Sequence, residues 1–341
     1  MTRYDGLQMA QIALTRFVTQ TGAWLDHCRA AERLGLTSVW AGDTPTHDGF
    51  AGAALAHAAT SRVSVGVAAA LPVRSPLQTA NAAAELARGG RAAPLVLAAG
   101  NALTLGLMHG EPYAPPVERM RDFHACVRAI LRGAKDEWIE IETEYAVARG
   151  PGLGLDATAV PLLLGATNPR MISLAGQIAD GLMVHLLTPR SAIGSRVDAA
   201  RRRAEGPFLS AAGLLVSVDE VEEVALSRAR AELAAALTLP MFGKRIRQAA
   251  GDDVQNEVAA LLETGDVVGA SDALPEACIR ELILVTTPER FRSEAESIDV
   301  DTVLPVPVGA FLALAEGSLG QPDDPAISQD MLTRALLGDD L

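Results

Sequence analysis

The sequence predicts an α/β protein built as a (β/α)₈ TIM barrel with insertions, and three observations support this fold class. Short apolar runs alternate with amphipathic helical segments along most of the chain. The runs are apolar on both faces, which is typical of buried parallel strands. The length of 341 residues suits one such barrel. A doubly wound open sheet is the competing topology.

Eight strands and the helices between them can be assigned in order. Asp219 with Glu222 forms a capping-box pattern before the helix that follows the seventh strand. The other predicted helices cover residues 22–34, 50–59, 77–87 and 117–131, and one follows Asn168. The predicted strands are residues 8–14, 38–41, 63–69, 95–99, 161–164, 182–184, 208–218 and 302–306.

The segment 161–189 is the most informative about function. A short apolar strand is followed by the turn Gly165-Ala166-Thr167, and Asn168 is then a good N-cap with Pro169 at the first helical position. A helix N-terminus that opens with small residues and free backbone N–H groups is suited to binding an anion, above all a phosphate. An ordinary capped helix is the structural alternative.

Two insertions interrupt the barrel pattern. Residues 135–150 alternate like an extra hairpin, and residues 237–280 have apolar residues at helical spacing where a barrel unit would need only a loop. The helical excursion at 237–280 either covers the barrel or forms a lid or pocket wall. We therefore expect a single barrel domain over residues 1–320 and a C-terminal tail at 321–341.

Composition and charge narrow the class of partner. The net charge of −13 argues against nucleic acid and anionic membranes. No apolar run approaches the length of a membrane span, and the N-terminus lacks a signal-peptide pattern. Cys28, Cys126 and Cys278 are unpatterned, and the histidines have no metal-ligand spacing. We expect a cytoplasmic enzyme with reduced thiols, no bound metal and a small-molecule substrate.

Five segments together resemble the bacterial-luciferase-like superfamily, within it the deazaflavin-dependent branch that includes methylenetetrahydromethanopterin reductase. The resemblance implies a barrel, often dimeric, that binds coenzyme F420 or FMN at the carboxyl ends of its strands. The segments are AAERLGLTSVWAGD (30–43), ATSRVSVGVAA (59–69), GGRAAPLVLAAGN (89–101), PLLLGATNPRMISLAGQIADG (161–181) and TTPERFRSEAESIDVDTVLPVPVG (286–309).

The resemblance assigns roles position by position. The turn that comprises Gly165, Ala166, Thr167, Asn168 and Pro169 would hold the cofactor phosphate. The strand end Val67-Ala68-Ala69 would form a bulge, commonly with a non-prolyl cis peptide, that supports the ring. Asn101 and His185, each just after a strand, would contact the cofactor or the site.

The sequence also departs from the family pattern. Many members have a histidine directly after the aspartate that ends the second strand, but here Asp43 is followed by Thr44, and His47 comes three positions later. The usual glycine run after the fourth strand is replaced by Ala98-Ala99-Gly100. Asp43 and His47 are therefore the candidate catalytic proton donor or its orienting group, with His185 in reserve.

The leading hypothesis is an oxidoreductase that transfers a hydride between F420 and a small, mostly apolar organic substrate, by reduction of C=C, C=N or C=O or the reverse. An FMN-dependent monooxygenase that is supplied by a separate flavin reductase is the alternative. A non-catalytic flavin-binding relative is the third hypothesis. The sequence GLGL at 152–155 lacks the context of a dinucleotide-binding fingerprint.

Overall fold

The chain folds around one curled parallel sheet, seen here in a computed structural model that describes residues 12–16, 21–44, 47–102, 105–106, 109–237, 239–309 and 332–337. Within the described residues, every pairing in this sheet is parallel. Its strands are β1 (Leu14–Arg16), β2 (Ser38–Gly42), β3 (Ser64–Ala70), β4 (Leu95–Ala98), β7 (Leu162–Ala166), β8 (Gly181–Val184), β9 (Leu209–Val218), β10 (Ile283–Thr286) and β11 (Thr302–Pro307).

The strand order shows that the sheet is barrel-like. From β1 to β9 each strand pairs with the next strand of this sheet, β4 pairing with β7, and β11 then pairs with β9. The two ends of the sheet meet where Ile12 bridges Val303, and the Ala13 N–H donates to the Val303 carbonyl at 3.0 Å. A doubly wound sheet would reverse its order at a switch point, and this one does not. The TIM-barrel prediction is confirmed.

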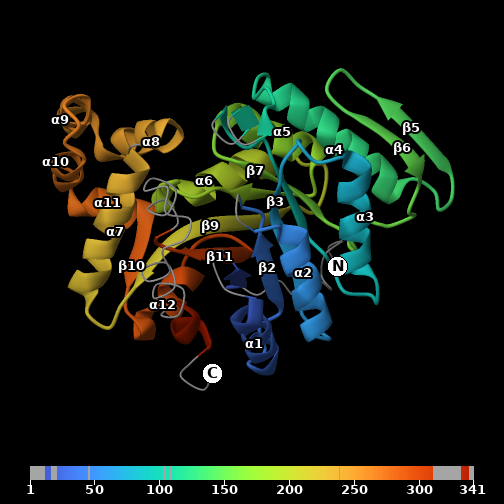
Figure 1. Cartoon of the computed structure of the whole chain (residues 1–341), viewed down its shortest axis with the longest axis horizontal. Helices are drawn as coiled ribbons and strands as arrows, with labels where there is room; N and C mark the ends of the chain where they lie inside the picture. The colour runs from blue at the N-terminus through green and yellow to red at the C-terminus, as the bar shows by residue number, and fades with distance from the viewer. Residues whose placement is uncertain are drawn as a thin grey trace.

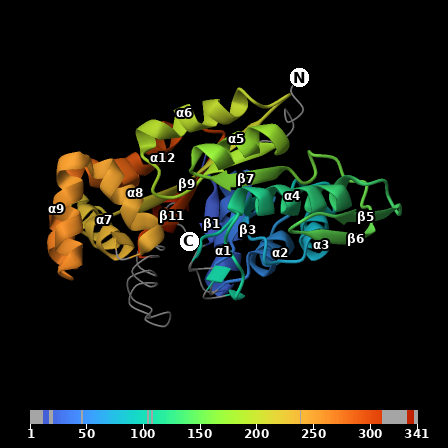
Figure 2. The same ribbon diagram turned by 90° about the horizontal axis from the view of Figure 1, so that it is seen from above.

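Helices surround the sheet, as Figures 1 and 2 show. Each follows a strand, so the connections are those of repeated βα units. The helices that cover the barrel are α1 (Thr21–Arg33), α2 (Gly49–Ala59), α3 (Pro76–Ala87), α4 (Pro116–Arg132), α5 (Pro169–Ile178), α6 (Arg190–Arg201), α7 (Glu222–Leu237) and α12 (Pro288–Glu296). Residues 332–337 are helical and bury Leu332 and Leu336 in the main core.

The inside of the barrel is filled by side chains from several strands. Trp40, Val96, Leu163 and other inward-facing residues form a separate buried cluster there. Gly66 makes room for the indole of Trp40, because a Cβ at Gly66 would lie 2.4 Å from that ring. The barrel interior is therefore a packed core, and any ligand must bind at its rim.

The two inserted regions lie at opposite ends of the molecule in both views (Figures 1 and 2). The first is an antiparallel hairpin of β5 (Trp138–Glu142) and β6 (Val147–Pro151). The second contains α8 (Pro240–Ala250), α9 (Asp252–Glu263), α10 (Val267–Asp272) and α11 (Glu276–Leu282), and it shares a second hydrophobic core with α7 and β10.

The structure corrects the prediction in two places. The apolar run Ile283–Thr286 is a ninth strand, β10, which pairs with the second half of β9. It follows α11 directly with no turn residue between them, so its sequence looks like the end of a helix. The capping box is also wrong, because α7 begins at Glu222, and the Asp219 carboxylate accepts from the Val221 N–H instead.

Residues outside the described ranges include 8–11 of the first predicted strand and most of the tail predicted at 321–341. Among the described residues, no helix is long and apolar enough to cross a membrane. The three cysteines are buried and form no disulfide.

Candidate active site at the carboxyl ends of the strands

The end of β3 departs from regular strand geometry. The register between β3 and β4 shifts between Ala68 and Ala70, and the Ala68–Ala69 peptide bond is cis. The Asp43 N–H at the end of β2 donates to the Ala68 carbonyl at 3.1 Å. The bulge and the cis peptide that the resemblance implied are therefore both present, and Asp43 holds them through its backbone.

The Asp43 carboxylate is part of an ion-pair network. Its oxygens accept from the Gly49 N–H at 2.9 Å and from Arg74 Nε and Nη2, each at 3.1 Å. Arg74 also donates to Asp48 at 2.7 Å and lies over the Phe50 ring, 5.1 Å from its centroid. A carboxylate held by a bidentate arginine is suited to positioning neighbouring groups rather than to donating a proton.

Arg74 is a site residue that the sequence analysis missed. Burial acts to lower its pKa, but the hydrogen bonds to Asp43 and Asp48 outweigh burial and raise it. The same partner lowers the pKa of Asp48, against a burial effect that would raise it. Arg74 comes 31 residues after Asp43, so only the fold brings the two together.

His47 lies in a tight turn with Thr44. The Thr44 N–H donates to the His47 carbonyl at 2.9 Å, and the His47 N–H donates to Thr44 Oγ1 at 3.1 Å. This turn places half-buried His47 in the same short loop as Asp43. Residues 45 and 46 of this loop lie outside the described residues.

Beyond β4 the chain turns at Gly100, whose φ of 67° favours glycine. A Cβ at Gly100 would lie 2.4 Å from Leu105 Cδ1, so the turn leaves no room for a side chain. Asn101 follows, half-buried, and its carbonyl accepts from the Leu105 N–H at 3.0 Å. Residues 103, 104, 107 and 108 of the segment that follows lie outside the described residues.

The turn after β7 has the predicted cap. Asn168 Oδ1 accepts from the Met171 N–H at 2.9 Å, and Pro169 is the first helical residue of α5. The Arg170 N–H has no hydrogen-bond partner among the described residues. An open backbone donor at the positive end of a helix is suited to an oxyanion.

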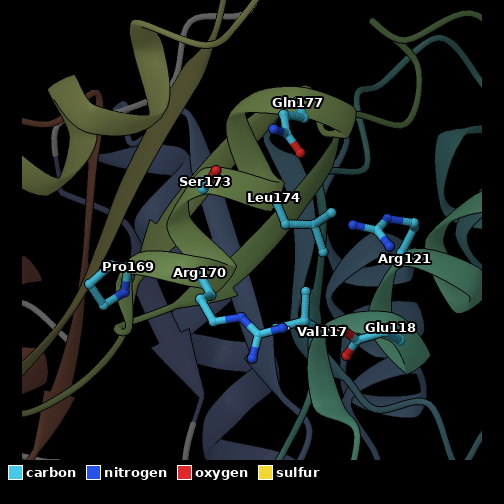
Figure 3. Close-up of a pocket in the computed structure, with 8 residues that line it drawn as sticks. All are labelled: Val117, Glu118, Arg121, Pro169, Arg170, Ser173, Leu174 and Gln177. Carbon is cyan, nitrogen blue, oxygen red and sulfur yellow. Dashed lines mark hydrogen bonds and ion pairs between the residues drawn. The ribbon is translucent and has the colours of Figure 1, made fainter.

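A groove of about 330 Å³ runs from this turn down the outside of the barrel, between α4 and α5 (Figure 3). Arg170 of α5 reaches across it to Glu118 of α4, with 3.2 Å between Nη2 and Oε1. The groove is lined by Val117, Glu118, Arg121, Pro169, Arg170, Ser173, Leu174 and Gln177. It adjoins the proposed phosphate turn but does not reach the predicted catalytic residues.

His185 follows β8, the strand next to β7. Burial, followed by the nearby positive charge of Arg245, lowers the pKa of His185 to about 4. The imidazole is therefore neutral at pH 7. Thr188 Oγ1 donates to the His185 carbonyl at 2.8 Å and accepts from Arg196 Nη1 at 3.0 Å.

The structure thus joins Asp43, Gly49, Ala68 and Arg74 into one hydrogen-bonded unit at the ends of β2 and β3. The cofactor-binding candidates at the ends of β4, β7 and β8 follow around the same rim, because adjacent parallel strands end at the same edge. The bonds that His47 makes with Thr44, and the bond that Thr188 donates to the His185 carbonyl, lie outside this unit.

Comparisons with known proteins agree with this geometry. Residues 12–298 match the family described as luciferase-like monooxygenases. A 5,10-methylenetetrahydromethanopterin reductase from Archaeoglobus fulgidus is 25% identical over 226 residues, which cover 63% of this chain and 67% of that protein.

Two solved structures share the fold over nearly the whole chain. The F420-dependent tetrahydromethanopterin reductase from Methanopyrus kandleri has a TM-score of 0.71 at 20% identity and covers 95% of this chain and 97% of its own. An F420-dependent secondary alcohol dehydrogenase has a TM-score of 0.69 at 18% identity, with 97% and 99% covered.

Proposed function

Because this chain belongs to the luciferase-like monooxygenase family, we propose that it is an F420-dependent oxidoreductase acting on a small, mostly apolar organic substrate. The observation that carries the proposal is the bulge at the end of β3, held by the Asp43 N–H on the same rim as the capped turn of α5. The relatives named for F420 chemistry support the choice of cofactor.

The residues present fit such a cofactor. Ala68 and Ala69 are only partly buried. Because their side chains are single methyl groups, a flat ring would be able to approach the end of β3 closely. The turn Gly165–Ala166–Thr167–Asn168–Pro169 and the open N–H of Arg170 would bind the phosphate. Asn101 and His185 would contact the cofactor from the ends of β4 and β8.

The bound deazaflavin would supply or accept the hydride. The chain would position the cofactor and the substrate and would supply a proton. Asp43, fixed by Arg74 and Gly49, would orient the bulge. His47 in the adjacent turn is the proposed proton donor, and His185 is the reserve candidate, whose neutral imidazole is suited to accepting a proton in the reverse direction.

An FMN-dependent two-component monooxygenase is the alternative, favoured by the description of the family itself. It would need a separate reductase to deliver reduced flavin. A non-catalytic flavin-binding relative is the third possibility, since the Asp-His pair typical of many members is absent here. We also propose that the protein is a homodimer and lies in the cytoplasm.

The test is a fluorescence or calorimetric titration of the full chain with F420 and, separately, with FMN. We expect micromolar binding of F420 and much weaker binding of FMN. Preference for FMN would favour the monooxygenase, and binding of neither would contradict both enzymatic hypotheses. Rapid reoxidation of the reduced cofactor by O₂ with product oxygenation would also favour the monooxygenase.

A matched pair of variants ties binding to the proposed site. Ala69→Leu should weaken F420 binding by about tenfold or more, because the larger side chain fills the space proposed for the ring. Ala54→Leu makes the same change on the exposed face of α2 and should bind F420 like the wild type. Equal affinity in both variants would place the ring elsewhere.

A further inference from the structure

Two half-buried arginines lie near His185 without a carboxylate partner. Arg196 belongs to α6, which follows β8, and Arg245 belongs to α8 of the helical excursion. Among the described residues, neither guanidinium forms an ion pair with Asp or Glu. Arginine stays charged at any working pH, so this end of the barrel holds two uncompensated positive charges.

The charges of the two arginines also act on one another. The pKa of Arg245 is lowered first by burial and then by the charge of Arg196, while the Tyr113 phenol acts in the opposite direction. Burial lowers the pKa of Arg196 as well. His185 does not offset the positive charge of the arginines, because its pKa of about 4 keeps the imidazole neutral.

Arg196 is held in place through the backbone of the rim. Its Nη1 donates to Thr188 Oγ1 at 3.0 Å, and that hydroxyl donates to the His185 carbonyl at 2.8 Å. Its remaining donors have no partner among the described residues. At the start of the same helix, Arg190 Nε is buried and also lacks a hydrogen-bond partner in the described part of the chain.

Three other arginines of this region are paired with carboxylates. Arg228 pairs with Asp219 at 2.8 Å, and Arg280 and Arg290 both pair with Glu222. At the start of α6, the Glu281 carboxylate accepts from the Ser191 N–H at 2.8 Å. Buried or half-buried charges in proteins are normally paired, because desolvation without a partner is costly.

We propose that Arg196 and Arg245 form an oxyanion site beside His185, which binds a carboxylate or phosphate group of a ligand at the rim. The guanidinium groups offer forked N–H donors that match such an anion. The core below them is apolar, with Leu186, Leu187 and Ile246 buried in the second hydrophobic cluster. A mostly apolar ligand with one anionic group fits this arrangement.

The anionic group can come from two molecules, and the identity of both follows from the proposed function. It belongs either to the substrate or to the acidic end of the cofactor, since β8 lies next to β7 and its phosphate turn. The arginine cluster itself is independent of that choice.

The test uses inorganic phosphate as the probe, titrated calorimetrically into the cofactor-free full chain at constant ionic strength. We expect saturable binding by the wild type and at least a tenfold loss in Arg196→Met and in Arg245→Met. Arg247→Met, on the same helix, should bind like the wild type. Absence of saturable binding by the wild type, or an equal loss in Arg247→Met, would overturn the proposal.

Folding and the source of the anion are checked separately. Arg196→Lys and Arg245→Lys keep the charge and should lose less affinity than the methionine variants, even if the latter are unstable. A lysine variant that loses as much as its folded methionine counterpart would overturn the guanidinium-fork geometry.

A repeat titration in the presence of saturating F420 distinguishes the sources. Phosphate binding that persists assigns the site to the substrate. Phosphate that is displaced by F420, but not by the deazaflavin riboside lacking the phosphate, assigns it to the cofactor. If F420 fails to bind while phosphate binds in an arginine-dependent way, the proposed function fails and the oxyanion site stands.

Discussion

The two ends of the barrel differ in how their charged side chains are paired. At the amino ends of the strands, buried charges are paired and bonded to the backbone: Asp180 accepts from Arg132 and from the Leu162 N–H at 2.9 Å. Half-buried Glu32 has no ion pair among the described residues but accepts from the N–H groups of Ser61 and Arg62 at 2.9 and 2.6 Å. These carboxylates join the end of one unit to the start of another.

At the carboxyl ends, charges are either paired around a bulge or have no carboxylate. Asp43 and Arg74 frame the cis peptide, while Arg196 and Arg245 lie half-buried beside neutral His185. We propose on this basis that one end is organised for stability and the other for a ligand. Substitutions at the two ends should therefore separate stability from binding.

The largest expected effect is at the amino end. Asp180→Ala leaves the Arg132 guanidinium uncompensated at a largely buried position, 15% exposed. We expect a loss of about 3–5 kcal/mol in the free energy of unfolding, measured by urea denaturation. F420 affinity of the folded fraction should be unchanged.

A double variant is the control. Asp180→Ala combined with Arg132→Met removes both charges and should be clearly more stable than Asp180→Ala alone. If Asp180→Ala costs less than about 1 kcal/mol, a surface-like ion pair would be the better description.

The next effect is at the carboxyl end and concerns turnover. His47→Ala should lower single-turnover oxidation of reduced F420 by about a hundredfold if His47 donates the proton. Cofactor affinity should stay within about twofold, because His47 is not among the proposed phosphate or ring contacts. His109→Ala, at an exposed position, is the matched control. Full activity in His47→Ala together with a loss in His185→Ala would transfer the role to His185.

Local patterns predicted most of the fold. Strands such as Leu162–Ala166 are short apolar runs with turn residues on both sides, and the Asn168 cap is decided within four residues of chain. By contrast, Ile283–Thr286 escaped prediction because it continues directly from a helix. Nothing in Val67-Ala68-Ala69 itself requires a cis peptide, so only the resemblance could suggest one.

The site was harder to predict because its charges come from distant segments. Arg74 and Arg245 lie on helices or loops with ordinary polar composition, where a surface position is the normal expectation. Their partners, or lack of partners, depend on how β3 and α8 reach the rim. The spacing of residues along the chain does not indicate which partners these side chains have in the fold.

Lowering the pH should reduce the free energy of unfolding through two histidines, His124 and His185. Burial, followed by the charge of Arg128, lowers the pKa of His124 on α4 to about 3, and His185 has a pKa of about 4. A lowered histidine pKa gives stability that is present above pH 6.5 and is lost as the pH falls from 6.5 towards these values. We expect His124 to account for about 2 kcal/mol between pH 7 and pH 5.

Unfolding measured at both pH values in His124→Phe and His109→Ala isolates this contribution, because carboxylates that titrate in the same range are common to both. The pH dependence should be shallower in His124→Phe only. Equal slopes in the two variants would mean that His124 is protonated in the folded protein.

The smallest effect tests the turn after β7 without disturbing its fold. Asn168→Asp keeps an N-cap, so the free energy of unfolding should change by less than about 0.5 kcal/mol. The added negative charge would lie near the proposed phosphate and should weaken F420 binding about fivefold, with less weakening at high salt. Asn81→Asp, on the exposed face of α3, makes the same change far from the turn and should leave affinity unaltered. Equal affinity in both variants would exclude this helix as the phosphate site, and the turn after β7 would then be structural, like the amino end of the barrel.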